Sequence, residues 1–187
     1  MNFSQFLNEA PYLMHFNRDE IDEVADTYET VMKYKVGNEG FYDEKYDIIH
    51  YKKKDKNNDY AIVDHDKKRV LVNSKLFEIT RGGKKYWRQA LLWKAPGVKS
   101  DMVDYLFLNI IVEKNKMILS DDIQTVGSMS FWRRHIKKLI GASRYTLGYV
   151  DKSGNVIKFN KDSWQETFDE MYSMEHAETS IFIKQMD

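Results

Sequence analysis

The sequence predicts a mixed α/β (α+β) fold, with a mostly antiparallel central sheet flanked by helices. Strand-like segments rich in β-branched and aromatic residues follow one another between residues 46 and 93. Segments with apolar residues at helical spacing then alternate with short strands toward the C-terminus. The 187 residues contain no internal repeat and no Pro-, Gly- or Ser-rich linker, so we expect one domain spanning residues 1–187.

The N-terminal region is expected to be helical. Pro11 interrupts the apolar positions of residues 3–16, which indicates two short helical turns rather than one helix. Asn17, with Glu20 three positions later, forms a capping-box pattern in front of a longer helix. Gly37 is expected to end that helix.

Four antiparallel strands are expected next. They lie at residues 46–51, 60–63, 70–72 with a continuation to 79, and 86–93. The polar residues 64–68 predict a hairpin turn between the second and third strands. The pair Gly82-Gly83 predicts the next reversal.

Helices and strands alternate in the second half. We expect helices at residues 100–111, 128–140 and 164–171, and strands at 116–120, 144–150, 156–159 and 180–183. Pro96-Gly97 ends the preceding strand, and Ser100 is expected to cap the first of these helices. In the second helix, Trp132 shares an apolar stripe with Ile136 and Leu139 and is expected to be buried.

Composition excludes several classes of function. The chain has no cysteine, which excludes disulfides, thiolate metal sites and a cysteine nucleophile. Its five histidines show no metal-ligand spacing, so no metal site is expected. The charges balance at 29 basic and 29 acidic residues, and no apolar run approaches the roughly 20 residues that span a bilayer. The N-terminus lacks signal-peptide features, and we expect a soluble, cytoplasmic protein with no membrane partner.

From Tyr86 the order strand, helix, strand, helix, strand resembles the GNAT superfamily of acyl-CoA N-acyltransferases. Residues 119–127, followed by Ser130-Phe131-Trp132, look like a strand-to-helix turn of GNAT-like proteins encoded by phages. The resemblance covers residues 46–150. It implies two neighbouring strands that splay apart, with the pantetheine arm of acetyl-CoA in the gap.

The resemblance also implies a phosphate-binding turn after the long strand. The family pattern is Gln or Arg, two residues, Gly, one residue, then Gly or Ala. Here Lys94 and Gly97 occupy the first and fourth positions, whereas Lys99 departs from the small residue at the sixth. A helix N-terminus favours an anion, so this stretch is a candidate pyrophosphate site. The alternative is an ordinary strand-to-helix turn capped by Ser100.

The resemblance assigns the cofactor contacts residue by residue. The proposed pyrophosphate donors are the backbone N–H groups of Gly97, Val98, Lys99 and Ser100. The strand edge from Trp93 to Ala95 is expected to pair with the pantetheine arm, and Arg133 to meet the 3′-phosphate.

Acyl transfer needs a base for the amine and an acid for the departing thiolate. Asp121 and Asp122 are candidate bases, and their alternative role is to cap the following helix. Many family members supply the acid as a Tyr on that helix, where this chain offers Trp132, whose indole cannot act as an acid. Tyr145 is close in sequence but is expected on the next strand.

The resemblance therefore implies a phage-encoded acyltransferase that moves an acetyl group from acetyl-CoA to an amine in the host cytoplasm. The alternative is a catalytically inactive protein of the same fold that binds a host or virion protein. A third hypothesis is nucleic-acid binding. It rests on a basic face comprising Arg133, Arg134, His135, Lys137 and Lys138, joined by Arg144. We expect such binding to be weak because the net charge is zero.

Overall fold

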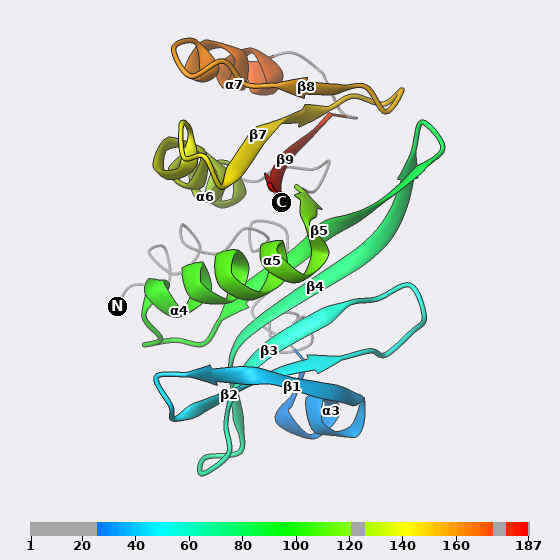
Figure 1. Ribbon diagram of the computed structural model, residues 1–187. Coiled ribbons are helices and arrows are strands. Elements are labelled where there is room, and N and C mark those ends of the chain that lie inside the picture. Colours follow the sequence, from blue (N-terminus) through cyan, green and yellow to red (C-terminus); the bar gives the residue numbers. More distant parts are fainter. Residues whose placement is uncertain (1–25, 121–125, 174–178, 187) are drawn as a thin grey trace.

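The computed structural model describes residues 26–120, 126–173 and 179–186, whose nine strands form one sheet (Figure 1). The prediction of a mixed α/β fold is confirmed in its coarse form: the open sheet is large and mostly antiparallel, and the helices are few. The predicted N-terminal turns and the Asn17 capping box lie outside the described residues.

The first described helix is shorter than predicted. Helix α3 (Tyr28–Lys33) begins after Thr27, whose hydroxyl accepts a hydrogen bond from the N–H of Thr30 at 3.2 Å. The prediction that Gly37 ends a helix is wrong, because Gly37 lies within strand β1 (Lys35–Tyr42). Pairing with the next strand determines the conformation of this segment.

Five antiparallel strands follow the chain order, one more than predicted. They are β1, β2 (Tyr46–Tyr51), β3 (Asp59–Asp64), β4 (Arg69–Arg81) and β5 (Lys84–Lys94). Gly82 and Gly83 join β4 to β5 with φ of +52° and +72°. Positive φ at both central residues is what a two-residue type I′ hairpin requires, so the predicted reversal is confirmed.

A continuous helical segment follows β5, with a π-helical middle. It consists of α4 (Ser100–Tyr105), η2 (Leu106–Val112) and α5 (Glu113–Asn115). The predicted helix over residues 100–111 is confirmed and extends to Asn115. The predicted capping role of Ser100 is wrong, because the N-cap is Lys99 and no side chain among the described residues caps it.

The remaining elements follow the predicted order. They are β6 (Met117–Leu119), α6 (Val126–Leu139), β7 (Tyr145–Val150), β8 (Val156–Lys158), α7 (Trp164–Ser173) and β9 (Ser180–Gln185). The sheet order is β1-β2-β3-β4-β5-β6-β9-β7-β8, so the last strand inserts between β6 and β7, antiparallel to both. Strands β5 and β6 are parallel.

The two faces of the sheet bury different clusters, because neighbouring strand residues point to opposite faces. On one face, Ile48 and Ile62 join apolar residues of η2, α6 and α7 in the main core. On the other, Ile49 and Val63 pack with Val31 of α3. Trp132 is 2% exposed in the main core, which confirms its predicted burial.

Candidate ligand site at the turn between β5 and α4

The turn that leaves β5 has a defined geometry. The N–H of Val98 donates to the carbonyl of Ala95 at 3.1 Å, which closes a four-residue turn. Pro96 and Gly97 occupy its central positions, and Gly97 has φ of +79°. A type II turn favours Pro followed by Gly at these positions. The sequence therefore specifies a rigid reversal just before α4.

The turn is also fixed to the neighbouring strand. The N–H of Ala95 donates to the carbonyl of Leu71 at 2.8 Å. The ammonium group of Lys94 donates to the carbonyl of Val98 at 3.2 Å. The N–H groups of Ala95 and Val98 are therefore already engaged, whereas Gly97, Lys99 and Ser100 are the N–H donors that this geometry leaves as candidates.

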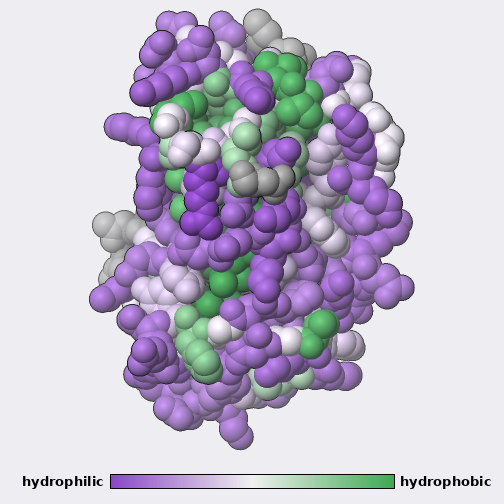
Figure 2. Space-filling view, in the orientation of Figure 1, coloured by the Kyte–Doolittle hydropathy of each residue, from purple (hydrophilic) through white to green (hydrophobic). Residues whose placement is uncertain are grey.

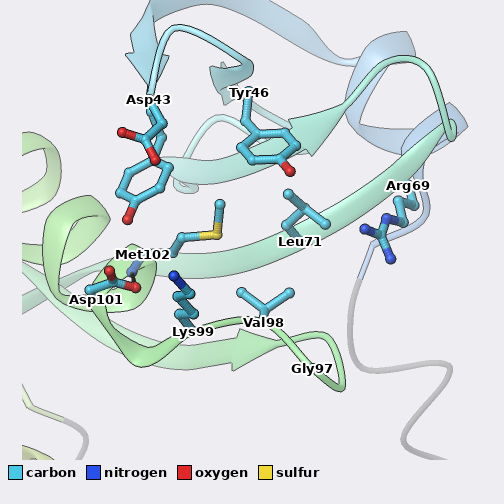
Figure 3. Close-up of a pocket in the computed structure, with 10 residues that line it drawn as sticks. Asp43, Tyr46, Arg69, Leu71, Gly97, Val98, Lys99, Asp101 and Met102 are labelled. Carbon is cyan, nitrogen blue, oxygen red and sulfur yellow. Dashed lines mark hydrogen bonds between the residues drawn. The ribbon is translucent and has the colours of Figure 1, made fainter.

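A cavity of about 280 Å³ opens beside this turn (Figure 3). We call it the turn cavity. It is lined by Tyr42, Asp43, Tyr46, Arg69, Leu71, Gly97, Val98, Lys99, Asp101 and Met102. The turn between β1 and β2, the start of β4 and the start of α4 thus meet at one place. Figure 3 shows Arg69 at one end of the cavity and Asp101 at the other, with the Lys99 amine directed inward.

Charge in the turn cavity is distributed unevenly. The Nε atom of Arg69 lies 3.4 Å from Asp64, outside the cavity lining. Lys99 forms no ion pair with any residue in the described ranges. At the other end, the Asp101 carboxylate accepts a hydrogen bond from the N–H of Met102 at 2.9 Å. Burial, and then the hydrogen bond to Asp101, raise the pKa of the Tyr42 hydroxyl, which stays protonated as a donor.

Within the described residues, strands β5 and β6 pair over a short stretch, because β6 ends at Leu119. Trp87 pairs with Ile118 and Arg88 with Leu119, and the ladder goes no further among the described residues. In the same region β5 carries an extra residue, because Leu91 pairs with Lys75 but Gln89 pairs with Leu76. Ala90 is the unpaired residue of this bulge. Bulges bend a strand, and this one lies just beyond the last described β5–β6 pair, at Arg88.

The backbone groups of Trp93 and Ala95, predicted to pair with the pantetheine arm, do not face the β6 side of β5. Successive backbone groups of a strand point to opposite edges, and Ala95 points toward β4. Lys94 and Leu92, rather than Trp93 and Ala95, therefore present their backbone groups to the β6 side. The indole of Trp93 packs on the second face, and its buried Nε1 finds no hydrogen-bond partner in the described part of the chain.

Of the three predicted catalytic residues, the structure describes Tyr145. Asp121 and Asp122 lie outside the described residues. Tyr145 begins β7, and both β6 and β9 lie between that strand and β5. At about 4.8 Å per strand, the axes of β5 and β7 are about 14 Å apart. The Tyr145 ring instead faces the guanidinium of Arg144, 5.8 Å from its centroid.

Ion pairs partly neutralise the basic face predicted on α6, and His135 does not belong to it. Arg133 pairs with Asp169 of α7, and Arg134 with Asp104 of α4 at 2.8 Å. His135 is 1% exposed, and its Nδ1 lies 2.9 Å from the carbonyl of Phe131. These ion pairs form between distant parts of the chain, so helical periodicity alone did not indicate them.

Sequence reasoning missed Tyr42, Tyr46 and Arg69 as site residues. They come from the β1–β2 turn and the start of β4, and only the strand order brings them next to Gly97. Their clearest local signal is the clustering of tyrosines around Asp43, which has φ of +55°. A polar turn of this kind is common at strand ends and does not indicate a ligand.

Metal and membrane sites receive no support from the described residues. In the described part of the chain no three His, Asp or Glu side chains are grouped as metal ligands. None of the helices within the described ranges is long and apolar enough to cross a membrane. The sequence matches no protein-family model, and a search of curated proteins finds no match.

Proposed function

We propose that this protein is a GNAT-like acyltransferase, of the phage-encoded type, that transfers an acetyl group from acetyl-CoA to an amine. One observation carries the proposal: β5 continues beyond its last described pair with the parallel strand β6, Arg88 with Leu119, and then leads into the Pro96-Gly97 turn and a helix. A gap between parallel strands that ends at a helix N-terminus is suited to an extended cofactor with an anionic end.

The order of elements supports the same proposal. Antiparallel strands lead to β5, a helix connects β5 to the parallel strand β6, and a second helix leads to β7. The bulge at Ala90 supports it further, because bulges bend a strand and this one lies just beyond the last described β5–β6 pair, at Arg88. The family resemblance implies a pantetheine arm in such a gap.

The proposed cofactor contacts follow the hydrogen bonds of the turn. The N–H groups of Gly97, Lys99 and Ser100 bind the pyrophosphate, while Val98 is excluded because its N–H closes the turn. The backbone groups of Lys94 and Leu92 pair with the amides of the pantetheine arm. The Lys99 side chain adds a positive charge beside the phosphates.

The proposed reaction is a direct transfer. The amine nitrogen attacks the thioester carbonyl, the carbon–sulfur bond breaks, and the sulfur leaves as the CoA thiolate. The amine loses a proton to a base, and the thiolate is protonated to the thiol. Asp121 or Asp122 is the proposed base, since both follow directly on Ser120 at the end of β6. Tyr145 is a weaker candidate for the acid, because two strands lie between it and β5.

The decisive experiment measures the melting temperature with and without acetyl-CoA. A ligand at 100 times its dissociation constant adds about 2.7 kcal/mol to stability, a shift of a few degrees for a chain of this size. A thiol-release assay with polyamines, aminoglycosides and lysine peptides then tests the transfer. If millimolar acetyl-CoA gives no shift, the cofactor proposal is wrong.

Binding of a host or virion protein without catalysis is the second candidate. It is favoured by β1, the end strand of the sheet within the described residues, where Val36 and Phe41 are 60% and 56% exposed. Figure 2 shows a mainly hydrophilic surface on the visible face, broken by separate hydrophobic areas. An unpaired strand edge with exposed apolar side chains is suited to adding a strand from a partner. Binding of acetyl-CoA with release of thiol on an amine would argue against this candidate.

A further inference from the structure

We propose that a group of exposed lysines at one end of the sheet binds single-stranded nucleic acid through its phosphates. The lysines lie on the loop between β2 and β3 and at the junction between α3 and β1. We call them the lysine patch, which consists of Lys33, Lys35, Lys52, Lys54 and Lys56. The patch shares no residue with the turn cavity, so this activity goes beyond acyl transfer and does not rest on it.

Backbone hydrogen bonds bring the lysine patch together. The N–H of Lys52 donates to the carbonyl of Tyr34 at 3.0 Å, and Lys35 begins β1 beside the end of β2. At the far end of the loop, the N–H of Glu78 in β4 donates to the carbonyl of Lys56 at 3.0 Å. The row from Lys35 to Lys56 thus crosses two strand spacings, about 10 Å at about 4.8 Å each. One strand of nucleic acid carries a charge about every 3.4 Å, so the row matches about three successive phosphates.

The loop that carries three of these lysines is fixed to the sheet at several points. Residues 52–58 form a longer connection than the two-residue turn of a tight hairpin. The ammonium of Lys53 donates to the buried carboxylate of Asp26 at 2.8 Å. The buried side chain of Asn58 places its Oδ1 2.6 Å from Nε2 of His50. The loop backbone is therefore already ordered, which lowers the entropic cost of binding.

Ion pairs do not neutralise the lysine patch. None of its amines lies within ion-pair distance of a carboxylate in the part of the chain that the structure describes. Two exposed carboxylates, Glu29 and Asp55, adjoin it in sequence. On α6, by contrast, Arg133 and Arg134 are both paired. The zero net charge of the whole chain therefore coexists with a cationic surface at this end of the sheet, which attracts anions.

An exposed aromatic ring within the patch favours single strands over duplexes. Tyr34 is 37% exposed, and the ammonium of Lys33 lies 5.2 Å from the centroid of its ring. A base stacked on the ring would have this cation beside its phosphate. Unpaired bases stack on aromatic side chains without regard to sequence, whereas the bases of a duplex are already stacked on each other. Lysine is a point charge, so phosphate contacts of this kind carry no sequence preference.

Fluorescence anisotropy of the full-length chain with labelled oligothymidine tests the patch, over a salt series from about 50 to about 200 mM. Three to five phosphate contacts predict a log–log salt slope between about −2 and −3.5 for a single strand, at about −0.7 per phosphate. Lys52→Gln with Lys54→Gln should make the slope less steep by about 1.4 and weaken binding more than about tenfold near 0.1 M salt. The matched control is Lys137→Gln with Lys138→Gln on the exposed face of α6, which removes the same charge and should bind like the parent.

The ring is tested separately from the charges. Tyr34→Ala should weaken binding of oligothymidine about fivefold or more without changing the salt slope, because stacking is lost and the phosphate contacts stay. Tyr34→Phe keeps the ring and should bind like the parent. A duplex of the same length should bind more weakly than the single strand.

Four results would overturn the assignment. The first is a parent that does not bind oligothymidine at the lowest salt. The second is equal loss of binding in the loop variant and the α6 control, which would mean that overall charge alone decides. The third is a duplex that binds as tightly as the single strand, with Tyr34→Ala unaffected. The fourth is tighter binding to vesicles of anionic lipid than to the oligonucleotide. Each result is independent of the thermal shift with acetyl-CoA, so either proposal can fail while the other stands.

Discussion

The carboxylate of Asp59 accepts a hydrogen bond from the backbone N–H of Leu76, 3.2 Å away, at the residue where β4 passes the bulge of β5. Asp59 is fully buried, and a second, longer hydrogen bond of 3.4 Å comes from the side chain of Asn57. A carboxylate thus fills a position in the sheet where the backbone pairing is irregular.

Asp59 makes stability depend on pH. Burial raises its pKa to about 6 from 3.8, although the hydrogen bonds from Asn57 and Leu76 act in the opposite direction. Because the folded-state pKa is raised, this contribution to stability is complete below about pH 4 and is lost as the pH rises through about 6. The free energy of unfolding of Asp59→Asn should therefore rise relative to that of the parent by about 3 kcal/mol between pH 4 and pH 7. This figure corresponds to a pKa shift of about two units.

Urea denaturation of both proteins at several pH values measures this difference. Asp66→Asn on the exposed β3–β4 turn is the control. A difference between Asp59→Asn and the parent that stays constant from pH 4 to pH 7 would contradict the proposed burial of an ionisable carboxyl.

Tyr51 connects two buried polar groups on the second face of the sheet. Its hydroxyl donates to Asp26 at 2.7 Å and accepts from the Asn73 side chain at 2.6 Å. Burial alone would raise the pKa of Asp26, but hydrogen bonds from Lys53 and Tyr51 lower it, so Asp26 is a buried anion. Tyr51→Phe removes one hydrogen bond each from Asp26 and Asn73. It should lower the free energy of unfolding by about 2–4 kcal/mol.

Chemical denaturation of Tyr51→Phe measures the effect, with Tyr34→Phe as the control because Tyr34 is 37% exposed. Equal stability of the two variants would mean that the hydroxyl of Tyr51 makes no net contribution to the free energy of unfolding.

Most strands and helices were predictable because their signals are local. The β-rich segments up to β5 and the alternation after it appear in the period of the apolar residues. Strand β1 was missed because it contains Gly37 and Gly40, and because Val36 and Phe41 are exposed. Its conformation depends on pairing with β2, which no local pattern encodes. The insertion of β9 between β6 and β7 is likewise a long-range feature.

The candidate site was predictable only in part, for the same reason. Pro96-Gly97 specifies a turn by its own conformational preferences, so the turn was identified correctly. The side chains of Tyr46 and Arg69 reach the turn through the sheet order. The resemblance assigned Arg133 to the cofactor, and local periodicity could not indicate its ion pair with Asp169, 36 residues away.

Trp132 is expected to be a major contributor to the main core. Its ring meets Phe107 and Phe131 edge-on, at centroid distances of 5.5 Å and 5.9 Å. Trp132→Ala should cost about 3–5 kcal/mol, the usual range for removing a large buried side chain. Thermal and urea denaturation measure the loss, and Lys138→Ala on the exposed face is the control. A variant that melts like the parent would contradict the contribution of Trp132 to the main core.

Nucleic-acid binding by α6 is expected to be weak. Four cations on one face would give a log–log salt slope of about −3.6 on duplex DNA, at about −0.9 per phosphate. Arg133 and Arg134 already pair with Asp169 and Asp104, so the slope should be smaller still. Fluorescence anisotropy over a salt series tests this. Submicromolar binding at 150 mM salt (about the cellular level) that is lost on Arg133→Glu with Lys137→Glu would overturn the expectation.

Gly97 and Gly83 form a matched pair for testing the cofactor site. Their φ values are +79° and +72°, and at both positions an added Cβ would meet no heavy atom of the described residues within 4 Å. Valine at either position therefore strains the backbone without a clash, at a cost of about 1–3 kcal/mol.

Only Gly97 lies in the turn proposed to bind pyrophosphate. Gly97→Val should abolish the thermal shift with acetyl-CoA, because a branched side chain blocks close approach of phosphate to the backbone. Gly83→Val should lower the melting temperature to a similar extent yet keep the shift. If both variants respond to acetyl-CoA like the parent, the phosphates bind elsewhere. If both lose the shift, the loss reflects destabilisation, and the turn between β5 and α4 has no special role.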